Sequence, residues 1–229
     1  KNMRLEFPII AGIVGIGMAP FAMQLASSLV QGTLNTQLVR YGNEIAVAAN
    51  GILMSVVHVI FMCIIAVNMA TQPIVGFNFG AKNFDRVKST LLKGIFLASA
   101  FSLVGFVLIQ LFPGTLVKMF NHSDQRLYEI GVRGLRLGAL TLFLVGFQVV
   151  VGNYFQSTGK AKLAMLLSLL RQVIVLTPVL LTLPHWLGLD GVWLSMPVAD
   201  SLSALAVAFF FRREILKLNE MIDSREKLL

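Results

Sequence analysis

Two ionisable residues lie inside apolar stretches of the sequence, Arg171 in the run 163–184 and Asp200 in the run 191–211. An ionised group in the interior of a bilayer costs several kcal/mol, so it normally faces a cavity or a partner of opposite charge. At a helical rise of about 1.5 Å per residue, the two positions lie roughly one turn apart in depth. We therefore expect an Arg171–Asp200 ion pair. A structural role for this pair is favoured over a moving charge, and both stay open.

Uncharged polar residues in other apolar stretches fall on single helical faces. In the stretch 18–39 they follow the spacing i, i+3, i+4, i+7 and i+11, which places them on one face. One face of the stretch 45–72 has polar residues at its two ends and flexible apolar or aromatic side chains between them. Such faces either line a cavity or only hydrogen-bond to neighbouring helices. The candidate cavity-lining residues are Gln24, Ser27, Ser28, Gln31, Asn35, Asn50, Met54, Phe61, Asn68 and Gln148.

The patterns of common catalytic and metal sites are missing from the sequence. Its three histidines, His58, His122 and His185, are far apart, and their spacing does not resemble that of metal ligands. It contains neither a nucleophile elbow nor a phosphate-binding or dinucleotide-binding glycine motif in a suitable context. The single cysteine, Cys63, excludes an intrachain disulfide. We therefore expect no enzymatic activity, no metal site and no cofactor.

The elements that position these residues are predicted to be membrane-spanning helices. Of the 229 residues, 56% are hydrophobic and 13% are charged, whereas roughly a quarter are charged in an ordinary soluble domain. A spanning helix needs about 20 predominantly apolar residues, and six stretches provide them. We predict an all-α integral membrane fold in which residues 18–211 form a six-helix transmembrane lobe. The spans are expected near residues 18–39, 45–72, 89–112, 130–155, 163–184 and 191–211.

The net charge of +8 is explained by membrane topology rather than by a nucleic-acid partner. Thirteen Lys and Arg residues fall on the side of the two termini, and five fall on the other side. Cytoplasmic loops carry such an excess, so both ends are predicted to be cytoplasmic. Trp186 and Trp193 flank the outer loop between the last two spans, as residues of an interfacial aromatic belt do.

Two flanking segments complete the predicted organisation. Residues 1–17 are expected to form an interfacial, cytoplasmic approach to the first span, because Pro20 suits the first turn of a helix. Residues 212–229 are expected to form a charged cytoplasmic tail.

Proline and glycine mark candidate hinges and close contacts. We expect lost helical hydrogen bonds at the inner end of the second span and a kink in the fifth. Gly134 and Gly138 form a G-x-x-x-G pair, a weak signal of close helix packing. The hinge candidates are Pro73, Gly76, Gly80 and Pro178.

Three stretches carry a resemblance to a known family. They are 72-QPIVGFNFGAKN-83 at the end of the second span, 154-YFQSTGKAK-162 after the fourth, and 190-DGVWLSMPVAD-200 at the start of the sixth. In this order and spacing they resemble the multidrug and toxic compound extrusion (MATE) transporters, and are closest to the MepA-like branch. The resemblance covers essentially the whole chain.

The resemblance implies that the six spans are the carboxy-terminal half of a twelve-span, secondary-active multidrug exporter with two pseudo-symmetric lobes. The family expels cationic, amphipathic molecules in exchange for Na⁺ or H⁺. The implied partners are therefore those molecules, one of the two ions, the lipid bilayer and the missing amino-terminal lobe. The implied location is the plasma membrane, here expected to be a bacterial inner membrane.

One departure limits what the resemblance transfers. NorM-like relatives place acidic residues in their seventh and tenth spans, whereas this sequence has nothing acidic between Glu6 and Glu44 and has Gly146 at the second aligned position. Asp200 is the carboxylate left as a coupling candidate. The alternatives to multidrug export are a lipid-linked oligosaccharide flippase of the same superfamily, which should have a more cationic cavity, and a non-transporting membrane structural subunit.

Overall fold

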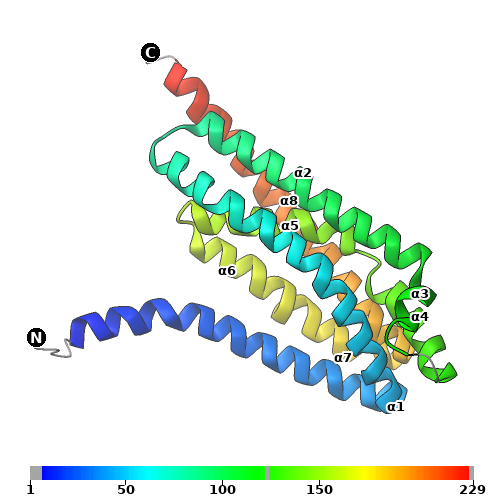
Figure 1. Ribbon diagram of the computed structural model, residues 1–229. Coiled ribbons are helices and arrows are strands. Elements are labelled where there is room, and N and C mark those ends of the chain that lie inside the picture. The colour runs from blue at the N-terminus through cyan, green and yellow to red at the C-terminus, as the bar shows by residue number, and fades with distance from the viewer. Residues whose placement is uncertain (1–6, 122–123, 227–229) are drawn as a thin grey trace, which may run out of the picture.

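The computed structural model describes residues 7–121 and 124–226, whose regular elements are all helices (Figure 1). A π-helix, η1, lies between α6 and α7. In chain order the elements are α1 (Phe7–Gly80), α2 (Phe84–Leu111), α3 (Pro113–Lys118), α4 (Gln125–Gly138), α5 (Leu142–Ser157), α6 (Ala161–Leu169), η1 (Leu170–Leu176), α7 (Thr177–Leu187) and α8 (Leu189–Glu226).

The chain reverses direction inside α1, at Asn43, so α1 consists of two helices, residues 7–42 and 44–80 (Figure 1). Asn43 has a φ of 59°, a backbone conformation that asparagine tolerates better than most residues. Its side-chain Oδ1 accepts a hydrogen bond from the backbone N–H of Ile45 at 3.0 Å, which satisfies one free donor at the start of the second helix. The reversal therefore has a local cause in the sequence.

By length and composition the described helices provide four candidate membrane spans, or five with one bent pair, and the reversal at Asn43 divides the first of them in two. Four stretches are long and apolar enough to span a bilayer, and α4 and α5 meet the same test together across a bend of 48°. The four stretches are Gln24–Gly80, Phe84–Leu111, Ala161–Leu187 and Leu189–Ser224.

Both ends of α1 lie beyond their expected positions. The helix begins at Phe7 instead of residue 18, and it continues through Pro73 and Gly76 to Gly80 instead of ending at residue 72. A proline removes one backbone hydrogen bond, whereas ending a helix inside a membrane would free several polar groups. The expected break at Pro73 and Gly76 is therefore wrong. The interfacial position of residues 1–17 stays a prediction, and residues 1–6 lie outside the described range.

The fourth and sixth spans also differ from expectation. The fourth is broken at residues 139–141, between α4 and α5, directly after Gly138. The sixth does not end at residue 211, because α8 continues to Glu226 through good helix formers such as Leu216 and Lys217. Most of the expected charged tail is thus helical, and residues 227–229 lie outside the described range.

Close packing of α4 corrects one expectation and confirms another. A Cβ atom added at Gly134 would lie 2.8 Å from the Trp193 ring, and one added at Gly138 would lie 2.5 Å from Leu53. The predicted close packing of the two glycines is therefore confirmed. Trp193 is only 1% exposed because it fills the space beside Gly134, so its assignment to an interfacial belt is wrong. Trp186, by contrast, is 88% exposed.

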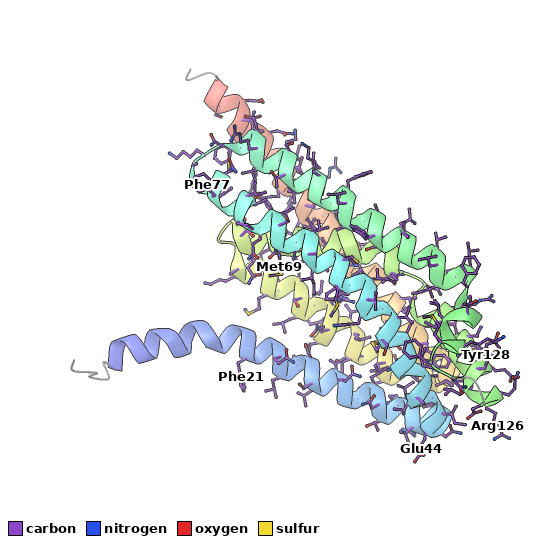
Figure 2. All side chains as sticks on the ribbon, in the orientation of Figure 1. Phe21, Glu44, Met69, Phe77, Arg126 and Tyr128 are labelled. Carbon is purple, nitrogen blue, oxygen red and sulfur yellow. The ribbon has the colours of Figure 1, made fainter. Side chains whose placement is uncertain are left out.

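The helices form one lobe with a diverging first helix. α2 lies against α5 and the second half of α1, and α7 lies against α8. The first half of α1 meets the other helices near Asn43 and diverges from them toward its N-terminal end (Figure 1). Phe21, which is labelled on this part in Figure 2, is 61% exposed.

Candidate functional site

The centre of the candidate site is the ion pair between Arg171 of η1 and Asp200 of α8. Arg171 Nε lies 2.5 Å from Asp200 Oδ1, which confirms the pair predicted from the sequence. The Thr141 hydroxyl donates a longer bond to Asp200 Oδ2 at 3.4 Å, and the Gln148 side-chain amide donates to the Asp200 backbone carbonyl at 3.2 Å. These contacts connect η1 and α8 to the bend between α4 and α5, through Thr141, and to α5 itself, through Gln148.

An irregular helix presents Arg171. Residues 170–176 form a π-helix, whose wider turn often occurs at functional sites. Pro178 follows it and has no N–H to donate to an earlier carbonyl. The Thr177 hydroxyl donates to the Gln172 carbonyl, five residues earlier, at 3.1 Å. The expected irregularity of this span is therefore present, but it precedes the proline and takes the form of a π-helix.

A cavity of about 320 Å³, which we call the Asp200 cavity, lies on one side of the ion pair. Both halves of α1, η1, α7, α8 and the bend between α4 and α5 contribute to its lining. Most of the wall is apolar, including Leu34, Met54, Phe61, Leu176 and Met196. The polar part of the wall consists of Ser27, Gln31, Arg171, Gln172 and Asp200.

A second cavity, of about 610 Å³, also borders Arg171, and we call it the Arg171 cavity. The second half of α1, α5, α6, η1 and α8 line it. Arg171 borders both cavities, whereas Asp200 borders only the first. The polar wall of the Arg171 cavity consists of Asn68, Gln148, Asn153, Gln156, Lys162, Ser168, Arg171 and Ser203.

The structure brings some of the predicted cavity residues together and excludes others. Ser27, Gln31, Met54 and Phe61 line the Asp200 cavity, and Asn68 and Gln148 line the Arg171 cavity. The remaining four residues line neither cavity. They are Gln24, Ser28, Asn35 and Asn50.

The four excluded residues have different surroundings. Ser28 donates its hydroxyl to the Gln24 carbonyl within the same helix, at 3.0 Å. Asn35 is exposed, and Asn50 is buried, with a side-chain oxygen that has no hydrogen-bond partner among the described residues. The shared helical face was predicted correctly, but a cavity occupies only part of its width. These four residues line neither of the two cavities, and their role in a substrate cavity stays a prediction.

The hinge candidates lie in ordered helical surroundings. Pro73 and Gly76 are inside α1, Gly80 ends it, and Pro178 lies in the first turn of α7. Their role as hinges stays a prediction.

Sequence analysis missed a second buried carboxylate, Glu214. Its Oε1 accepts a hydrogen bond from the Tyr154 hydroxyl at 3.0 Å and pairs with the Lys160 ammonium. Glu214 lies on α8, fourteen residues after Asp200, which is close to four full turns at about 3.6 residues each and so places both on one face. The spacing would have revealed this, but the expected end of the span at residue 211 hid it.

The absence of an acidic residue at position 146 has a steric cause. A Cβ atom added at Gly146 would lie 2.3 Å from the Ala98 carbonyl oxygen and 2.6 Å from the Ser102 hydroxyl oxygen. No carboxylate side chain fits between α5 and α2 at this distance. The departure from the NorM-like pattern is therefore part of the helix packing.

Comparisons with known proteins agree with this architecture. The chain matches the family model "MatE" over residues 20–181. It is 27% identical over 208 residues to "Multidrug export protein MepA" of Staphylococcus aureus (strain bovine RF122 / ET3-1), in a match that covers 90% of this chain and 45% of that protein. The chain thus spans less than half the length of this curated relative.

Solved structures show the same lobe. The "MATE multidrug transporter DinF-BH" is 35% identical, with a TM-score of 0.78, and the match covers 93% of this chain and 48% of that one. An inward-facing "multidrug resistance MATE family transporter of the MOP superfamily" is 22% identical, with a TM-score of 0.85, and the match covers 95% and 50% of the two chains. The latter similarity supports the fold alone.

Proposed function

The chain belongs to the MatE family, and on that premise we propose that it forms one lobe of a secondary-active multidrug exporter. As a member of a transporter family it is not an enzyme. MepA is named a multidrug export protein and DinF-BH a multidrug transporter, and the present chain matches about half of each. The proposal therefore includes a second lobe as the partner, and transport is assigned to the two lobes together.

The Asp200 cavity is the observation that carries this proposal. Its apolar wall can remove the hydrocarbon surface of a ligand from water, which contributes about 25 cal/mol for each Å² buried. Its charged end presents a carboxylate to a positive group. An apolar compartment whose charged end contains a carboxylate paired with a displaceable arginine suits a cationic amphipathic molecule, because each part of the ligand can meet its preferred environment.

Ion coupling in this lobe is assigned to the Arg171–Asp200 pair. In the structure Arg171 neutralises Asp200, so a cationic ligand must compete with the guanidinium for the carboxylate. The exchanged Na⁺ or H⁺ is proposed to act at the same carboxylate, which would then hold one cation at a time. The rocking of the two lobes would expose it in turn to each side of the membrane.

The proposed orientation places the exporter in a bacterial inner membrane with both ends of this chain in the cytoplasm. The distribution of Lys and Arg residues supports this orientation.

Two glutamines on the first half of α1 provide a matched test. Gln31 lines the Asp200 cavity, and Gln24, two turns away on the same helix, lines neither cavity. Losing one hydrogen bond of about 1 kcal/mol to the ligand should weaken its binding about fivefold. Gln31→Ala in the full-length protein should therefore weaken binding of rhodamine 6G, a cationic dye, by that factor and reduce dye export, whereas Gln24→Ala should change neither.

Binding can be measured by fluorescence polarisation of the purified protein, and export by dye loss from cells with matched amounts of transporter in their membranes. An unchanged affinity in Gln31→Ala, or an equal loss in Gln24→Ala, contradicts the assignment of this cavity to the ligand.

A further inference from the structure

The two cavities that Arg171 borders differ in net charge: the Asp200 cavity contains the neutral Arg171–Asp200 pair, whereas the Arg171 cavity has an additional cation, Lys162. Among the described residues, the lining of the Arg171 cavity includes two cationic side chains, Lys162 and Arg171, and neither Asp nor Glu. The carboxylate of Asp200 borders the other cavity. Arg171 therefore borders both cavities, whereas its partner Asp200 borders only the Asp200 cavity.

Of the two cations of the Arg171 cavity, Arg171 is balanced by Asp200, whereas Lys162 has no neighbouring carboxylate as its partner among the described residues. Glu214, the second buried carboxylate of α8, forms an ion pair with Lys160 and accepts a hydrogen bond from the Tyr154 hydroxyl. It forms no ion pair with Lys162 in the described part of the chain. Among the described residues Lys162 makes neither an ion pair nor a side-chain hydrogen bond. Lys162 therefore offers a free ammonium group at the wall.

Arg171 retains donors for a second partner. Its Nε contacts Asp200, and a guanidinium has four further N–H groups on its two terminal nitrogens. The Arg171 side chain is 39% exposed in the lobe, so part of it stays accessible from a cavity. Guanidinium groups bind carboxylates and other oxyanions with paired hydrogen bonds.

Uncharged donors complete the wall. The side-chain oxygen of Asn68 accepts a hydrogen bond from the Asn153 amide at 2.8 Å, which leaves the Asn68 amide nitrogen as a donor. The hydroxyls of Ser168 and Ser203 lie on the same wall. An oxyanion that left water for this cavity would therefore find both charge and hydrogen-bond donors, which offset its cost of desolvation.

We propose that the Arg171 cavity binds the carboxylate or another oxyanion of an amphipathic ligand. This inference rests on the proposed function, because it assigns an additional chemical group to the molecules that the lobe handles. A ligand with a cationic apolar body and an attached carboxylate then uses both compartments. Its body lies in the Asp200 cavity, and its oxyanion lies beside Arg171 and Lys162.

A pair of dyes with one body and different charges tests the proposal. Rhodamine 6G is a cationic ester, and its free acid carries the same xanthene cation with a carboxylate in place of the ester. We expect Lys162→Gln in the full-length protein to weaken binding of the free acid about fivefold, because one partly exposed ion pair is lost. Binding of the ester should change by less than twofold, and Lys162→Arg should preserve the affinity for the acid.

The matched control is Lys93→Gln on α2. Lys93 is an exposed lysine that lines neither cavity, so its replacement removes the same charge without touching the proposed site. Both affinities should stay within twofold of the unsubstituted protein. Binding of the ester to every variant also reports that the protein is folded.

Each outcome decides between defined alternatives. A selective loss of acid binding in Lys162→Gln supports the oxyanion site. An unchanged acid affinity, an equal loss for acid and ester, or the same loss in Lys93→Gln overturns it while leaving the proposed exporter intact. Failure of the unsubstituted protein to bind the ester refutes the proposed function, and with it this inference.

Discussion

Replacing Arg171 should destabilise the lobe measurably, because it leaves Asp200 without its charged partner. The Asp200 side chain is 10% exposed, and its other side-chain contact is the Thr141 hydroxyl at 3.4 Å. Breaking a buried ion pair by removing one member costs about 3–5 kcal/mol. The Arg171 side chain is 39% exposed, so solvent screens the pair, and we reduce the expected cost to about 2 kcal/mol.

The expected change in Tm follows from the size of the lobe. For an unfolding unit of 150–250 residues, 1 kcal/mol corresponds to about 2–4 °C, so Arg171→Met should lower the Tm of the transition in which this lobe unfolds by about 4–8 °C. The double variant Arg171→Met with Asp200→Leu removes both charges and should recover most of that loss. The measurement is thermal unfolding of the full-length protein in detergent, at one protein and detergent concentration for all variants.

A second ion pair supplies the control. Arg133 pairs with Asp190, but its side chain is 67% exposed, and exposed pairs contribute about 0–1 kcal/mol. Arg133→Met should therefore cost far less than Arg171→Met. Equal losses in the two single variants, or a double variant no more stable than Arg171→Met, would refute the argument that burial makes the partner of Asp200 indispensable.

Two further stability predictions follow from helix packing, and both use the same unfolding assay. Gly146→Ala should cost about 1–3 kcal/mol of stability through overpacking, because its Cβ would lie 2.3 Å from the Ala98 carbonyl oxygen. The control is Gly152→Ala, which has open space around the new Cβ and should be nearly neutral. Equal effects of the two variants would contradict the packing of α5 on α2. Trp193→Ala should cost about 3–5 kcal/mol because the side chain is 1% exposed, and Trp186→Ala, at an 88% exposed position, should cost much less; the reverse order would contradict the burial of Trp193.

The charge pair and the all-helical membrane fold were predictable because membrane energetics leave few options. A charge in an apolar run needs a partner or a cavity, and Arg171 and Asp200 are the two charges that lie well inside their runs. Helix boundaries were predicted less well. Proline is a poor guide to helix ends in a bilayer, because Pro20 and Pro73 each remove only one hydrogen bond from α1.

The exact lining of the cavities required the tertiary structure. Periodicity places residues such as Ser27, Ser28 and Gln31 on one face of a helix, but the neighbouring helices decide which part of that face stays open. Ser27 and Gln31 border the Asp200 cavity, whereas Ser28 bonds to its own backbone. The hydrogen bond that the Ser27 hydroxyl donates to the Gln172 side-chain oxygen at 2.7 Å joins distant segments, so it also required the tertiary structure.

The position of Arg171 between two cavities bears on how the proposed exporter releases a cation. Without Arg171, release of a cationic ligand would leave Asp200 buried and unpaired. The desolvation cost of that unpaired carboxylate would oppose release, whichever side of the membrane the site faces. Arg171 removes that cost, because it neutralises Asp200 when the ligand leaves. The Arg171 cavity, of about 610 Å³, provides space for the side chain to turn away when the ligand enters. In the proposed mechanism the guanidinium of Arg171 therefore makes binding of the cation reversible. An oxyanion in the Arg171 cavity would stabilise the position of Arg171 away from Asp200, and so would strengthen binding of the cation at Asp200.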